Sequence, residues 1–101
     1  MFDQLKKIFG GGDDLAALVK SGAQVIDVRS REEFASGNLK GSVNIPLPDL
    51  NRSLSRIKKD RAVIVCCASG MRSSAAKSML ESHGFKVYNG GGWRSLERKV
   101  S

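Results

Sequence analysis

The sequence predicts an α/β protein in which a central, mostly parallel β-sheet is flanked by helices on both faces. Short β-branched runs alternate with helix-like segments along the chain, and the connections between them are short, which is typical of parallel sheets covered by helices. The run AVIVC at residues 62–66 is apolar without alternation, as expected for a strand that is buried on both faces. A chain of 101 residues is long enough to bury one core without disulfides.

The first helix and the first strand are expected within residues 13–28. An aspartate at position 13 or 14 can cap the helix by accepting hydrogen bonds from its first amides. Gly22 stands where the end of a helix favours glycine. The run Gln24–Val28 is rich in β-branched residues and predicts a strand. The buried side of the helix is expected to consist of Leu15, Leu18 and Val19.

The middle of the chain predicts short elements. Ser30 and Glu33 have the spacing of a capping box, which opens one or two helical turns. Val43–Ile45 is a brief extended segment before a proline. Pro48 suits the first turn of a further helix, and the basic residues that follow suit the negative end of its dipole. The apolar positions of this helix, three and four residues apart, are Leu50, Leu54 and Ile57.

The last third of the chain continues the order of strand and helix. Ala62–Cys66 and Lys86–Tyr88 predict strands, and the helix between them is expected to begin near Ser73. The glycine-rich segment NGGG predicts a turn, and Trp93–Lys99 predicts a final helix. The buried side of the middle helix is expected to consist of Ala76, Met79 and Leu80.

Residues 1–12 are expected to form a separate N-terminal segment, and residues 13–101 a single domain. The segment places Phe2, Leu5 and Phe9 at helical spacing, and we interpret it as a docked terminal helix. It lacks the long apolar region and the cleavage site of a secretory signal, and no run in the sequence reaches the roughly 18 apolar residues of a membrane span. We therefore expect a cytoplasmic protein that does not bind membranes.

The chain is basic, with a formal net charge of +7. Its Lys and Arg residues are scattered rather than gathered into one run, and only one Tyr, one Trp and four Phe are present. Proteins that bind nucleic acid usually combine a basic stripe with aromatic residues. We therefore expect no nucleic-acid partner and interpret the charge as a solvated surface that attracts small anions.

Two adjacent cysteines, Cys66 and Cys67, are the residues that point to chemistry. Neighbouring cysteines cannot link distant parts of a fold, which argues against a disulfide scaffold and favours a reducing compartment. Cys66 belongs to the expected buried strand and is interpreted as a small core residue. Cys67 would be the first residue beyond the carboxyl end of that strand, where open α/β sheets bind their ligands. The reactive candidate is therefore Cys67.

The residues after Cys67 predict a loop that binds an anion. They are mostly small, so the loop can curl with its amide N–H groups directed at the sulfur, and the N-terminus of the next helix adds partial positive charge. Such surroundings can lower the pKa of a cysteine from about 8.5 to between about 3.5 and 7.5, which predicts a thiolate at neutral pH. Arg72 can either donate to a bound oxyanion or brace the loop. The alternative is that Cys67 is only a small residue in a tight turn.

These residues resemble a known family. The sequence CASGMRS, from Cys67 to Ser73, is similar to the active-site loop of rhodanese-like domains, which are single-domain sulfurtransferases. The segment VIDVRSREEFASGNLKGSVNIPL (Val25–Leu47) resembles an early signature of that family, and GFKVYNGGGW (Gly84–Trp93) resembles its closing turn. The three blocks appear in the family's order and cover most of the chain from about Asp14 onward.

The resemblance implies a rhodanese-like α/β fold and a thiosulfate sulfurtransferase. Cys67 would be the catalytic residue and would carry sulfur as a persulfide, which implies ping-pong kinetics. The donor would be a small anion such as thiosulfate, and the acceptor cyanide or a thiol, including the thiol of a protein. No metal or organic cofactor is implied, and we expect a monomer. The residues expected to bind the substrate are Ala68, Ser69, Gly70, Met71, Arg72 and Ser73.

Two positions depart from the family pattern, and two other functions stay open. Ala68 stands where many thiosulfate-using relatives have a basic residue, and Asn38 stands where histidine is common. A Cys-Arg loop phosphatase or arsenate reductase is one alternative, although its loop would carry one residue more than the four between Cys67 and Arg72. A non-catalytic rhodanese-like binding module is the other.

Further residues are expected to have structural roles. Asp27 and Arg29, at the end of an expected strand, are interpreted as pairing with loop partners such as Arg72 or Glu32. His83 is interpreted as a helix cap or a surface residue.

Overall fold

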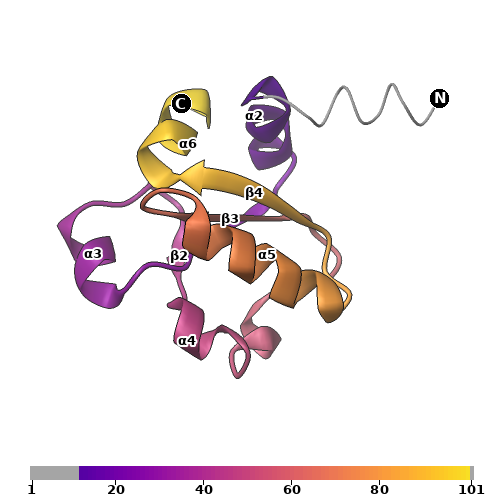
Figure 1. Ribbon diagram of the computed structural model, residues 1–101. Helices are drawn as coiled ribbons and strands as arrows, with labels where there is room; N and C mark the ends of the chain where they lie inside the picture. The colour runs from indigo at the N-terminus through magenta and orange to yellow at the C-terminus, as the bar shows by residue number, and fades with distance from the viewer. Residues whose placement is uncertain (1–11, 101) are drawn as a thin grey trace.

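The computed structural model describes residues 12–100, and within them it contains one parallel sheet of four strands. The order across the sheet is β2-β1-β3-β4, so β1 and β3 are central (Figure 1). The docked helix expected in residues 1–9 lies outside the described residues. The strands are β1 (Gln24–Asp27), β2 (Val43–Asn44), β3 (Val63–Cys67) and β4 (Val87–Gly92).

Helices cover both faces of this sheet, which confirms the predicted α/β fold. In Figure 1, α2 and α6 lie above the sheet, α4 and α5 lie below it, and α3 lies beside β2. The helices are α2 (Gly12–Lys20), α3 (Arg31–Ser36), α4 (Leu47–Leu50), α5 (Met71–Ser82) and α6 (Trp93–Val100), with a short 3₁₀ helix η1 (Leu54–Arg56).

The strand β3 is buried along its whole length and divides the core in two. Because successive side chains of a strand point to opposite faces, Val63, Val65 and Cys67 contact the cluster on the α5 side, which includes Ala76 and Leu80. Ile64 and Cys66 contact the cluster on the α2 and α6 side. The two adjacent cysteines therefore face opposite halves of the core.

The segment NGGG, expected to be a turn, is part of β4. Beyond a register shift between Val65 and Cys66, Cys66 pairs with Gly91 and Cys67 with Gly92. Gly91 has a φ of 73°, a value that glycine adopts at no steric cost. This pairing also makes Cys67 the last residue of β3 rather than the first residue of the loop.

The helix expected from Pro48 to Ile57 is also divided, into α4 and η1. The Ser53 hydroxyl donates to the backbone oxygen of Asp49 at 2.9 Å, and such local bonds compete with helical hydrogen bonding. The amide of Ile57 then donates to the oxygen of Leu54 at 3.0 Å, which is the shorter spacing of a 3₁₀ turn. By contrast, the capping box of α3 is present as predicted, with both of its hydrogen bonds.

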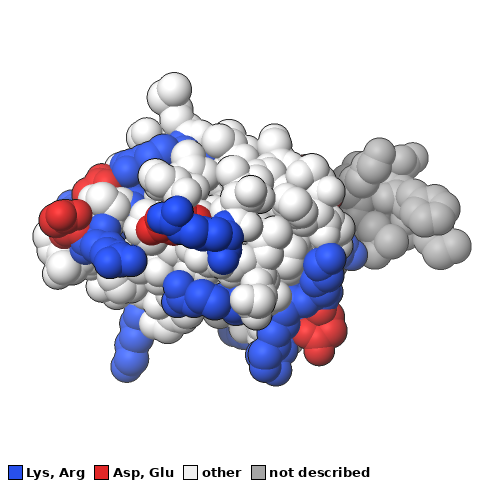
Figure 2. All heavy atoms as spheres, turned by 90° about the horizontal axis from the view of Figure 1, so that it is seen from below, with Lys and Arg blue, Asp and Glu red and all other residues white. Residues whose placement is uncertain are grey.

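The surface carries its positive charge in separate places. On the face seen in Figure 2, Lys and Arg side chains lie in small groups with uncharged surface and some carboxylates between them. Among the helices of residues 12–100, none combines the length and the apolar character that crossing a membrane requires.

Candidate active site

Cys67 lies at the carboxyl end of the central strand β3, where the chain turns into α5. Gly70 makes this turn with a φ of 105°, in the left-handed region that favours glycine. The neighbouring strand passes very close: a Cβ added to Gly92 would lie 2.8 Å from the backbone oxygen of Ala68. The loop is therefore confined between α5 and β4.

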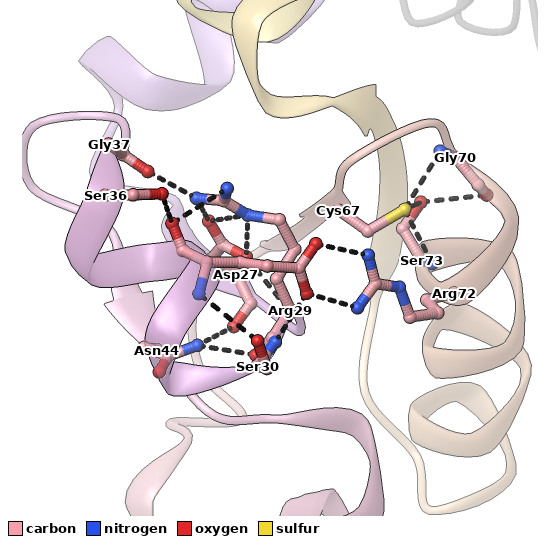
Figure 3. A network of polar contacts seen from close by, with 11 residues as sticks. Asp27, Arg29, Ser30, Ser36, Gly37, Asn44, Cys67, Gly70, Arg72 and Ser73 are labelled. Atoms are coloured by element: carbon pink, nitrogen blue, oxygen red, sulfur yellow. Dashed lines mark hydrogen bonds and ion pairs between the residues drawn. The ribbon is translucent and has the colours of Figure 1, made fainter.

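Backbone amides of the loop point at the sulfur of Cys67 (Figure 3). The amide of Gly70 donates to Sγ at 2.9 Å and the amide of Ser73 at 3.4 Å. The thiol in turn donates to the hydroxyl of Ser73 at 3.5 Å. Of the amides that the curled loop was expected to direct inward, those of Gly70 and Ser73 donate to the sulfur.

The surroundings of the two cysteines shift their pKa values in opposite directions. Burial, the largest single influence, raises the pKa of Cys67, but the hydrogen bonds from Ser73 and from the amides of Gly70 and Ser69 outweigh it, so the pKa is lowered. Burial raises the pKa of Cys66 to about 12, and the charge of Asp27 adds to the increase. Both cysteines are free thiols, and of the two it is Cys67 that ionises more readily, because its pKa is lowered.

Access to Cys67 is narrow. The residue exposes 1% of its surface, so a reaction at Sγ requires a slender reagent or a small movement of the loop. The exposed residues that directly follow Cys67 in the loop are uncharged: Ala68 and Ser69 are exposed, and Met71 is 81% exposed. Positions 68 to 71 contain no basic residue.

Arg72 braces the loop against a neighbouring helix. Its two terminal nitrogens donate to the two carboxylate oxygens of Glu33 on α3, at 2.7 and 2.9 Å (Figure 3). This pair and the capping bonds of Ser30 lower the pKa of Glu33 to about 2, and the same contact raises the pKa of Arg72. Of the two roles considered for Arg72, the structure shows the brace.

Asp27 and Arg29 have a structural pairing, as expected, but the predicted partners were wrong. They bind each other, with Nη2 of Arg29 2.8 Å from Oδ2 of Asp27, and both side chains are almost fully buried. Arg29 also donates to the backbone oxygens of Glu33 and Gly37. Asp27 and Arg29 are two positions apart in the sequence, so their side chains can reach each other directly. They do not need Arg72 as a partner, and Arg72 binds Glu33 instead.

Asn89 is a polar residue of the site that the sequence reasoning missed. Its Oδ1 accepts a hydrogen bond from the Ser73 hydroxyl at 2.7 Å, and its Nδ2 donates to the Ser74 hydroxyl at 3.0 Å. Assigning Asn89 to a turn concealed this role. The available signal was its position near the carboxyl end of a strand next to β3, the same edge of the sheet as Cys67.

Other residues lie outside this group. His83 is exposed at the end of α5 and contacts Asn51 at 3.1 Å, while Arg94 stacks on the ring of Trp93 at 5.2 Å. Within residues 12–100, no cluster of three or more His, Cys, Asp or Glu side chains is suited to hold a metal ion.

Comparison with known proteins agrees with the fold. The family model described as "Rhodanese-like domain" matches residues 12–99. The chain belongs to this family. It is 30% identical over 89 residues to the thiosulfate sulfurtransferase GlpE of Pseudomonas aeruginosa, covering 87% of the chain and 81% of GlpE.

Two further similarities place the rhodanese-like chain among its relatives. It is 36% identical over 80 residues to the uncharacterized protein YqhL of Bacillus subtilis, covering 77% of the chain but only 64% of YqhL. The structure of the human single-domain sulfurtransferase TSTD1 superimposes with a TM-score of 0.76 at 30% identity, covering 87% of the chain and 93% of TSTD1.

Proposed function

We propose that the protein is a thiosulfate sulfurtransferase that carries sulfane sulfur on Cys67. The observation that carries the proposal is the convergence of the amides of Gly70 and Ser73 on Sγ, at the carboxyl end of a central parallel strand. Membership of the rhodanese-like family and the similarity to GlpE support it. The lowered pKa of Cys67 supplies the nucleophile, since the thiolate is the reactive form of cysteine.

The reaction consists of two displacements at sulfur. In the first, the Cys67 thiolate attacks the outer sulfur of thiosulfate, the S–S bond of the donor breaks, and sulfite leaves with the electron pair. In the second, a thiolate or cyanide attacks the outer sulfur of the persulfide, and Sγ leaves as a thiolate. No proton or external electron is needed, and one covalent intermediate links the two steps, which predicts ping-pong kinetics.

The loop suits the intermediate better than it suits the donor. The outer sulfur of the persulfide is negatively charged, and inward amides stabilise such a charge without reorganisation. For the oxygens of thiosulfate, however, positions 68–71 offer no basic side chain, and both terminal nitrogens of Arg72 are bound to Glu33. We therefore expect weak binding of thiosulfate.

The alternative functions receive less support from the same contacts. A Cys-Arg phosphatase needs a free guanidinium to hold the oxyanion, and Arg72 is engaged by Glu33. A binding module has no need of a thiol whose pKa is lowered.

We further propose that the protein acts as a monomer in a reducing compartment such as the cytoplasm, with no nucleic-acid partner. Its free thiols are consistent with such a compartment, and its scattered surface charge is consistent with the lack of a nucleic-acid partner (Figure 2).

Intact-mass measurement after incubation with thiosulfate tests the proposal. The wild-type protein should gain one sulfur atom and lose it again on addition of cyanide. Cys67→Ser should gain none, whereas Cys66→Ser, altered at the adjacent residue, should behave as the wild type does. Turnover of p-nitrophenyl phosphate without any gain of sulfur would favour the phosphatase, and neither reaction would favour the binding module.

A further inference from the structure

The hydroxyl of Ser73 faces three possible acceptors. Ser73 is completely buried, and its Oγ lies 2.7 Å from Oδ1 of Asn89, 3.0 Å from the backbone oxygen of Gly70 and 3.5 Å from Sγ of Cys67. A hydroxyl has only one hydrogen to donate. The three neighbours therefore compete for it, and Asn89 has the shortest contact.

The neighbours of Asn89 determine which way its amide points. The backbone amide of Gly91 donates to Oδ1 at 2.8 Å, and a backbone amide can only donate. Reversing the side-chain amide would place its NH₂ group against that N–H and break the bond. Oδ1 is consequently the atom that faces Ser73, so the Ser73 hydroxyl donates to Asn89 and turns a lone pair toward Cys67.

This orientation suits one protonation state of Cys67 and opposes the other. A neutral thiol donates to the Ser73 oxygen, whereas a thiolate needs the hydroxyl to donate to it. For that donation the hydroxyl must leave both Asn89 and Gly70. The neutral thiol and the thiolate thus require two different positions of the Ser73 hydroxyl hydrogen.

We propose that Asn89 is a positioning residue that holds the Ser73 hydroxyl off the sulfur, and that this hydroxyl swings to Cys67 only when Sγ is a thiolate. The role that this inference gives to the Ser73 hydroxyl in sulfur transfer rests on the proposed function. In the persulfide the charge lies on the outer sulfur, so Sγ needs no donor and the hydroxyl stays with Asn89. When an acceptor takes the outer sulfur, the electron pair of the broken S–S bond remains on Sγ, and the hydroxyl turns to stabilise it.

Other charged and titratable side chains also lie near Cys67. Arg72 on α5, which is bound to Glu33 on α3, interacts electrostatically with Cys67. Asp27 ends β1 and is bound to the buried Arg29, and Cys66 precedes Cys67 in β3. Substitutions at Ser73 and Asn89 leave all of these groups in place, so a change in the pKa of Cys67 reports on the hydroxyl and its acceptor.

The test measures the pKa of Cys67 from the pH dependence of its alkylation by iodoacetamide, read by mass spectrometry of the labelled peptide. Asn89→Ala frees the hydroxyl for the thiolate, and a hydrogen bond to a charged group is stronger than one between neutral groups. We expect about fivefold more thiolate below the pKa, which corresponds to a pKa lower by about 0.7 unit. Ser73→Ala should raise the pKa, because the thiolate loses the hydroxyl that would donate to it.

Ser74→Ala is the matched control. It removes the bond between Nδ2 of Asn89 and the Ser74 hydroxyl, which Asn89→Ala also removes, but it leaves the contact between Ser73 and Asn89 intact. Its pKa should equal that of the wild type. In a Ser73→Ala background, Asn89→Ala should cause no further decrease. Asn89→Asp keeps the acceptor oxygen and adds negative charge, so it should raise the pKa, and it supplies the opposite sign should Asn89→Ala fold poorly.

A higher or unchanged pKa in Asn89→Ala would overturn the inference, because Asn89 would then only support the loop. The same shift in Ser74→Ala would also overturn it. Alkylation requires neither a sulfur donor nor an acceptor, so a protein that never forms a persulfide still gives a definite result here. The failure of the inference and the failure of the proposed function are therefore distinguishable.

Discussion

A methyl group added at Gly92 should disturb the candidate site through the backbone of the loop. The Cβ of Gly92→Ala would lie 2.8 Å from the oxygen of Ala68. An ordinary contact at this position begins at 3.4 Å, so the loop or β4 must move by about 0.6 Å. Because the Gly70 amide lies only 2.9 Å from Sγ and hydrogen bonds weaken steeply when misaligned, we expect the pKa of Cys67 to rise.

Gly90→Ala is a matched control on the same strand. Its Cβ would lie 3.0 Å from side-chain atoms of Ile64 and Leu96, in the cluster on the opposite face from Cys67. Overpacking typically costs about 1–3 kcal/mol, so both variants should lose a similar part of the free energy of unfolding. Of the two variants, only Gly92→Ala should change the pKa of Cys67.

Two assays separate these effects. Urea unfolding gives the free energy of unfolding, and the rate of iodoacetamide alkylation against pH gives the pKa of Cys67. The reasoning would be refuted by a Gly92→Ala protein whose Cys67 has the wild-type pKa, or by an equal increase in Gly90→Ala. In either case, the close approach of β4 would not be what holds the loop.

Three further predictions concern acidity, the cysteines and the buried ion pair. Folding lowers the pKa of Glu33 from 4.5 to about 2. Its ionised form therefore stabilises the fold above about pH 4.5, and that contribution disappears as the pH falls toward 2. In urea unfolding across this range, the free energy of unfolding of Glu33→Gln should decline less steeply than that of the wild type. Iodoacetamide at neutral pH should label Cys67 but leave Cys66 unmodified, and peptide mass spectrometry would contradict this if both were labelled equally. Asp27→Ala should lower the free energy of unfolding by about 3–5 kcal/mol, because it leaves a buried guanidinium without its partner; a loss below about 1 kcal/mol in urea unfolding would be inconsistent with that pairing.

Local patterns predicted much of the fold. The capping box of Ser30 and Glu33 acts within four residues, and the apolar run of β3 reports burial on both faces, so neither depends on the rest of the chain. The expected end of that strand at Cys66 separated Cys66 from Cys67, although β3 extends to Cys67. The pattern was misleading at NGGG, because glycine favours turns locally, whereas pairing with β3 extends the segment as a strand.

The partners within the candidate site were harder to predict. Arg72 binds Glu33, which is 39 residues away in the sequence, and nothing in either local pattern specifies that contact. Asn89 reaches Ser73 because β4 lies beside β3, in a register that pairs Asn89 with Val65. A slip of one residue would turn Asn89 to the other face of the sheet.

The amino-acid sequence by itself determined the alternation of strands and helices, the burial of β3 and the selection of Cys67 as the candidate reactive thiol, because these follow from side-chain periodicity and from the small residues after the strand. The tertiary structure alone decided how that thiol is surrounded. The brace from Glu33, the acceptor supplied by Asn89 and the close approach of Gly92 all depend on the distances between segments that are far apart in the chain, and those distances are set only when the sheet and its helices pack together.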